Sequence, residues 1–72
     1  MAEQFPRALF VLRLKQVKNR TGLSRSGIYQ KMADGEFPAS ISLGLRAVGW
    51  VESEIDTWVS VKIAARDQAV QS

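Results

Sequence analysis

The chain contains no cysteine and no histidine among its 72 residues. Without cysteine there is neither a disulfide framework nor a thiolate metal site, which suits a cytoplasmic protein. Histidine is the most frequent general base and the most frequent metal ligand, so its absence removes the usual starting points for acid–base catalysis and metal binding. We therefore expect no metal, no cofactor and no enzymatic activity.

Long hydrophobic runs are also missing. The longest, "ALFVL" at 8–12, is far shorter than the ~20 residues that a membrane-spanning helix needs. The first residues, "MAEQFPRA", lack the charged start and apolar stretch of a signal peptide. The composition, 46% hydrophobic, suits one small globular domain. We expect a cytoplasmic protein with no membrane partner, folded over 8–66, with a flexible arm at 1–7 and a frayed tail at 67–72.

Acidic residues are scarce in the first half of the chain. Residues 1–35 carry seven lysines and arginines against two acidic residues, whereas residues 36–72 carry three against five. The net charge is +3, and the pI is about 9.8. A basic half of this kind suggests a polyanionic partner. The alternative is an ordinary solvated surface.

Hydrophobic spacing and turn residues predict a mainly α chain with a small β-hairpin. Gly22 and Gly35 are typical helix stops, and Ser24 is a typical N-cap. Gly49, in the returning strand of the hairpin, indicates a close backbone approach. The predicted elements are a strand at 8–14, helices at 15–21 and 25–34, a hairpin at 40–50 with its tip near 44–47, and a helix at 52–66.

This order of elements is that of a winged helix-turn-helix. The second helix presents polar side chains near its N-terminal end, where recognition helices meet base edges. Arg25 can bind guanine, and Gln30 can bind adenine. Ser24 and Thr21 can hold a phosphate beside the helix N-terminus. The predicted contacts with DNA are Ser24, Arg25, Ser26, Tyr29, Gln30, Lys15, Lys18, Thr21 and Arg46.

Several of these positions have a second interpretation. Tyr29 can point its hydroxyl at a phosphate or pack its ring on the core. Lys15, Lys18 and Arg20 can contact phosphates or remain ordinary solvated charges. Arg46, near the hairpin tip, can enter a minor groove.

Aromatic and acidic residues dominate the second half of the chain. Trp50 and Trp58 are expected in the core, because a domain of this size needs their area. The predicted last helix has an apolar stripe formed by Ile55, Trp58, Val59 and Ile63. The carboxylates at its start, Glu52, Glu54 and Asp56, are expected to complement the helix dipole rather than catalyse a reaction.

The sequence resembles the AlpA-type phage and prophage regulators, which are related to MerR-like and excisionase winged-helix domains. The matching stretches are "LRLKQV" (12–17), "TGLSRSGIYQKMADGEFP" (21–38) and "LGLRAVGWVESEIDTWV" (43–59). The resemblance implies a small DNA-binding transcriptional regulator of prophage genes, with the recognition helix carrying Ser24 to Gln30 and Arg46 on the wing. Family members usually have a bulkier residue at Gly27. They also often have Lys and Pro before the wing turn, where this chain has Ala39, Ser40 and Ser42.

Three functional hypotheses follow. The first is a sequence-specific double-stranded DNA-binding regulator that acts as several copies on repeated or paired sites, with possible self-association. The second is an excisionase-like factor that bends DNA and partners an integrase. The third is a protein-interaction module without DNA, which would need an apolar anchor on the outer face of the second helix, where only Tyr29 and Ala33 are available.

Overall fold

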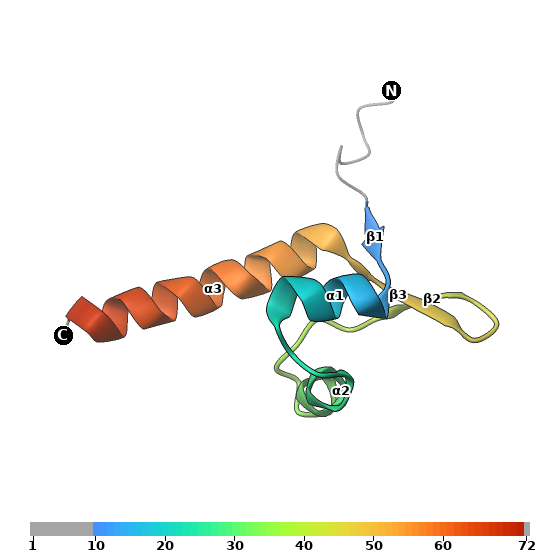
Figure 1. Cartoon of the computed structure of the whole chain (residues 1–72), viewed down its shortest axis with the longest axis horizontal. Coiled ribbons are helices and arrows are strands. Elements are labelled where there is room, and N and C mark those ends of the chain that lie inside the picture. The colour runs from blue at the N-terminus through green and yellow to red at the C-terminus, as the bar shows by residue number, and fades with distance from the viewer. Residues whose placement is uncertain (1–9, 72) are drawn as a thin grey trace, which may run out of the picture.

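A computed structural model of the chain describes residues 10–71. Three helices and three short strands follow one another in the order β1-α1-α2-β2-β3-α3 (Figure 1). The flexible arm predicted at 1–7 lies outside the described residues. No described helix is long and apolar enough to cross a membrane. The elements are β1 (Val11–Leu12), α1 (Leu14–Thr21), α2 (Arg25–Ala33), β2 (Ile41–Gly44), β3 (Ala47–Val51) and α3 (Glu52–Gln71).

The corner between α1 and α2 is determined by local sequence signals. Gly22 ends α1 in the left-handed conformation, with φ 74°, and its N–H donates to the carbonyl of Lys18 at 2.8 Å. The Ser24 hydroxyl then accepts the N–H of Gly27 at 3.0 Å and caps α2. Gly35, with φ 75°, follows the C-cap of α2. The predicted stop, cap and helix are thus confirmed, with α2 ending at Ala33, one residue earlier than expected.

The three strands form one antiparallel sheet in the order β1-β3-β2. The β2–β3 hairpin was predicted from the sequence, but the pairing of β1 with β3 was not. That pairing brings Val11 opposite Val51 and Leu12 opposite Trp50. A Cβ added at Gly49 would collide with Val11 Cγ1 and lie 3.1 Å from the Leu12 carbonyl oxygen. The close backbone approach predicted at Gly49 is therefore confirmed, and the approaching segment is strand β1.

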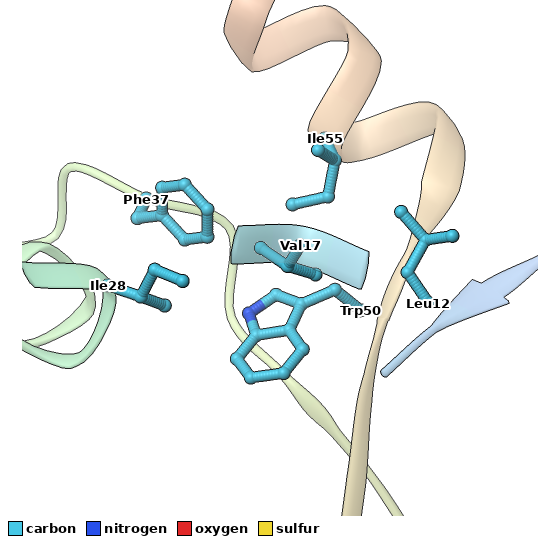
Figure 2. Packing of buried hydrophobic residues seen from close by; sticks show 6 residues of the cluster. All are labelled: Leu12, Val17, Ile28, Phe37, Trp50 and Ile55. Carbon is cyan, nitrogen blue, oxygen red and sulfur yellow. The ribbon is translucent and has the colours of Figure 1, made fainter. Parts of the chain in front are cut away.

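The buried core lies where α1, α2, α3 and the sheet meet (Figure 2). Trp50 is the largest completely buried side chain, and Trp58 is half-buried against the cluster. Every element except β2 contributes side chains to the core or packs against it. The same core therefore holds both α2 and the base of the hairpin. The buried side chains are Leu12, Val17, Ile28, Phe37, Trp50 and Ile55.

The last helix is longer than the sequence predicted. α3 continues to Gln71, so the boundary expected near Arg66 is wrong, and the segment 67–71 that was assigned to a frayed tail is helical. The residues beyond Ile63 include Ala64, Ala65 and Ala69, which favour helix, and contain neither glycine nor proline. The C-terminal half of α3 extends past the body (Figure 1), which explains why Ile63, at the end of the predicted stripe, is exposed.

Candidate nucleic-acid interface

The N-terminal end of α2 presents polar side chains to solvent. Ile28 is completely buried and anchors the helix from behind. Ser24, Arg25, Ser26 and Gln30 are exposed. Ser26 and Gln30 lie two residues on either side of Ile28 and therefore point roughly the other way on a 3.6-residue helix, whereas Arg25 lies on its flank. The two faces predicted for this helix are therefore confirmed. The exposed face offers hydroxyl, guanidinium and amide groups within two helical turns.

Arg25 is linked to the core through two aromatic rings. Its guanidinium carbon lies 5.1 Å from the centre of the Tyr29 ring, a cation–π distance. The Tyr29 ring in turn meets the buried Trp50 edge-to-face, with ring centres 6.2 Å apart. Tyr29 is half-buried, so its ring packs on the core as one of its two interpretations predicted. A contact between its hydroxyl and a phosphate remains a prediction.

Gln30 and Asp34 form a hydrogen bond one turn apart on α2. The Gln30 amide nitrogen donates to the Asp34 carboxylate oxygens at 3.3 and 3.4 Å. These long, exposed bonds are weak and exchange readily with another acceptor. Within residues 10–71 the side-chain oxygen of Gln30, Oε1, accepts no hydrogen bond, which leaves the amide able to pair with a base edge.

The hydroxyl groups near the α1–α2 turn already have partners inside the protein. The Thr21 hydroxyl donates to the Val17 carbonyl at 2.8 Å and accepts from the Leu23 N–H at 3.2 Å. Ser24 caps Gly27, and its oxygen lies 3.3 Å from that of Ser26. Any phosphate contact by Thr21 or Ser24 therefore has to add to these bonds. Ser26, which caps nothing, is the least constrained of the three.

The basic residues of α1 divide into two groups. Lys15 and Lys18 are exposed and form no ion pair within residues 10–71. Arg20 instead pairs with Glu52 at 2.8 Å and with Asp56 at 3.3 Å. The hydrogen bond with Glu52 raises the pKa of the Arg20 guanidinium above its ordinary value. Arg20 thus joins α1 to α3, and only the two lysines keep the predicted phosphate-binding role.

Two of the carboxylates at the start of α3 have a structural role that was not predicted from the sequence. Glu52 and Asp56 are four residues apart and share a helix face, which is the arrangement that lets both reach Arg20. No group of three potential metal-ligating side chains occurs in the described part of the chain. The two carboxylates therefore serve as ion-pair partners.

The tip of the hairpin carries two side chains that point into solvent. Arg46 is exposed, and its φ of 62° is the one positive value at a non-glycine residue between 10 and 71. Leu45, its neighbour, is 93% exposed. Arg46 was predicted as a DNA contact, whereas no role was predicted for Leu45.

Residues 10–63 match the protein family described as "Prophage CP4-57 regulatory protein (AlpA)". The chain belongs to this family. The match covers the α1–α2 corner, the hairpin and the first half of α3, so every predicted contact lies inside it. The AlpA family comprises regulatory proteins rather than enzymes, which agrees with the expectation drawn from composition.

Two curated relatives of this AlpA-family chain are similar over most of its length. The uncharacterized protein ORF88 of Enterobacteria phage P4 is 46% identical over 55 residues, which are 76% of this chain and 62% of the relative. The chain thus spans less than two thirds of that relative. A protein of Escherichia coli K12 is 41% identical over 59 residues, which are 74% of this chain and 84% of the relative. That second relative is named DNA-binding transcriptional activator AlpA.

Proposed function

We propose that this protein is a sequence-specific double-stranded DNA-binding transcriptional regulator of phage or prophage type. The observation that carries the proposal is the exposed polar end of α2, with Arg25, Ser26 and Gln30 facing solvent while Ile28 fixes the helix to the core. The relative named as a DNA-binding activator supports it. In this proposal α2 enters the major groove, and the β2–β3 hairpin is a wing on the adjacent minor groove or backbone.

The proposed contacts divide by chemistry. Arg25 and Gln30 read base edges, since a guanidinium matches guanine and an amide matches adenine. Lys15, Lys18 and Ser24 bind phosphates and set the position of α2 on the duplex without reading sequence. The ring of Tyr29, packed between Arg25 and Trp50, holds the guanidinium in place before DNA arrives.

The small size of the chain favours several copies on one regulatory site. A single module of this kind buries about 600–1,000 Å² of protein surface on DNA, which is a modest interface. We therefore infer binding to repeated or paired sites, where neighbouring copies can contact one another. The expected location is the cytoplasm, with the protein associated with the nucleoid when it is bound to DNA.

The protein-interaction hypothesis finds less support. It required an apolar anchor on the outer face of α2, yet none of the exposed large hydrophobic side chains among residues 10–71 lies on this helix. The outer face of α2 is polar, as DNA contact demands.

The test compares variants that the proposal separates by role. A preferred site is first selected from fragments of the host genome, and binding is measured on that site and on random duplexes at fixed salt. Arg25→Ala and Gln30→Ala should each reduce the preference for the selected site by roughly 5- to 150-fold, the equivalent of about 1–3 kcal/mol per base contact. Lys18→Ala should weaken binding to both duplexes alike. Unchanged sequence preference in Arg25→Ala would exclude α2 as the recognition helix.

A further inference from the structure

The most exposed large hydrophobic side chain of the described residues is Leu45, which is 93% accessible at the tip of the hairpin. The next, Phe10, is 64% exposed, and Ile41 and Leu43 of the same hairpin are 40% and 44% exposed. Surface leucines are common, but one that projects almost entirely from the end of a two-stranded arm contributes nothing to the core. The side chain is therefore free to contact another molecule.

We propose that Leu45 is an apolar wedge that the hairpin inserts between adjacent base pairs from the minor groove, which kinks the duplex. This inference rests on the proposed DNA-binding function and extends it to the shape of the bound DNA. Apolar side chains inserted at a base step partly unstack it and bend the duplex by about 20–90° toward the major groove. A leucine at the end of a projecting arm is the kind of side chain that such insertion uses.

The charge around Leu45 favours nucleic acid over a protein surface. Between Glu36 and Glu52 the sequence contains one charged residue, Arg46, and no carboxylate. The Arg46 guanidinium forms no ion pair or hydrogen bond with residues 10–71, so it remains available beside Leu45. A narrow minor groove concentrates negative potential and attracts an arginine. Arg46 would therefore hold the hairpin tip in the groove while Leu45 meets the bases.

The backbone of the hairpin is suited to press a side chain into DNA. Leu45 and Arg46 form a two-residue turn, with Gly44 paired to Ala47 across it. Behind the turn the ladder shifts register between Ser42 and Gly44 and then continues through the Ser42–Val48 pair. The Ser42 hydroxyl donates to the Gly44 carbonyl at 3.4 Å and so bridges this irregularity. At the base of the arm, Gly49 packs directly against β1, which ties the hairpin to the body. The hairpin projects from the end of the molecule opposite the C-terminus of α3 (Figure 1).

The experiment measures the bend angle of a duplex that carries the selected site, by gel mobility with the site permuted along the fragment. Wild-type protein should bend the duplex within the range that wedge proteins produce. Leu45→Ala should bind with at most a tenfold loss of affinity but lose most of the bend, whereas Leu45→Met should keep it. Val61→Ala, at an exposed apolar position on α3, is the matched control and should leave both quantities unchanged.

A base analogue that fluoresces when unstacked supplies a second measurement. Placed at the kinked step, it should brighten with wild-type protein and with Leu45→Met, but not with Leu45→Ala. A straight duplex with wild-type protein, or an equal bend with Leu45→Ala, would overturn the wedge while leaving DNA binding intact. No binding of any duplex by wild-type protein at low salt would instead overturn the proposed function itself.

Discussion

Arg46 occupies a backbone conformation that glycine adopts far more readily. With φ 62°, an ordinary L-residue pays about 1–2 kcal/mol because its Cβ approaches the following carbonyl oxygen. The turn itself needs only a residue that accepts this conformation, and glycine, asparagine or aspartate would do so at lower cost. An arginine at this position therefore indicates that its side chain, rather than its backbone, is what the hairpin tip requires.

Replacing Arg46 with glycine should separate stability from binding. We expect Arg46→Gly to leave the free energy of unfolding unchanged or to raise it by up to about 1 kcal/mol, since relief of strain is partly offset by the greater entropy of glycine in the unfolded chain. Affinity for DNA should fall, because the exposed guanidinium is lost. Urea unfolding and mobility-shift titration measure the two effects. A destabilised variant with undiminished affinity would contradict this view of the turn.

Ser24 is the residue on which the start of α2 depends. Ser24→Ala removes the acceptor of the Gly27 N–H and should lower the free energy of unfolding by about 1 kcal/mol, a typical value for a lost N-cap. Ser60→Ala provides the control, because Ser60 is exposed within α3 and caps no helix. Thermal unfolding of both variants tests the prediction. Equal melting temperatures for the two would show that the cap contributes little.

At the scale of elements, the parts predicted well are those determined by neighbouring residues. Gly22 ends α1 and Ser24 caps α2, and both effects depend only on neighbouring residues. The α1–α2 corner could therefore be predicted from a short stretch of sequence. The end of α3 was predicted wrongly because no local signal marks it. Neither glycine nor proline ends that helix, and alanines continue it. The pairing of β1 with β3 joins residues nearly forty positions apart, and a two-residue strand carries too little pattern to reveal its partner.

In the candidate site, too, the features set by neighbouring residues could be predicted, and the contacts between distant residues could not. The exposed face of α2 could be predicted from helical spacing around Ile28, and the structure confirms it. The pairing of Arg20 with Glu52 and Asp56 could not, because it joins the end of α1 to the start of α3 across more than thirty residues. The stacking of Arg25 on Tyr29 is local, but the support that Trp50 gives to Tyr29 depends on the tertiary fold.

The contact between β3 and β1 yields a prediction about the sheet. Gly49→Ala should lower the free energy of unfolding by about 1–3 kcal/mol, because the added methyl group overpacks against Val11 and the Leu12 carbonyl. Val11→Ala in the same chain removes the nearest obstructing atom and should restore part of that loss. Urea unfolding of the single and double variants measures the coupling. Simple addition of the two losses would indicate that the strands do not meet at this point.

At the scale of the whole molecule, the ion pairs of Arg20 influence how charge is distributed. One guanidinium pairs with two carboxylates of α3 and offsets half of their charge, while Lys15 and Lys18 are left as the unpaired cations of α1. Two basic residues on one short helix therefore have different roles, although they look alike in the sequence. Lys18 belongs to the outer surface, and Arg20 belongs to the packing of α1 on α3.

The salt dependence of DNA binding should distinguish these roles. A plot of log K against log[salt] should fall with a slope of roughly −0.9 for each phosphate neutralised. Lys18→Ala should reduce the magnitude of that slope by about 1. Arg20→Ala should leave the slope nearly unchanged and lower the melting temperature instead, since it breaks the link between α1 and α3. An equal change of slope in both variants would place Arg20 on the DNA as well.

The complete burial of Trp50 gives the molecule a built-in optical reporter. The Trp50 indole lies against the Tyr29 ring, and the Arg25 guanidinium stacks on that ring. Movement of this guanidinium onto a base would therefore change the electric field around the Trp50 fluorophore. The other indole, Trp58, lies beneath Lys62 and hydrogen-bonds to the Glu36 carbonyl, just beyond the C-terminal end of α2. In a Trp58→Phe background, emission from the remaining indole would follow the docking of α2 on a duplex without any attached dye.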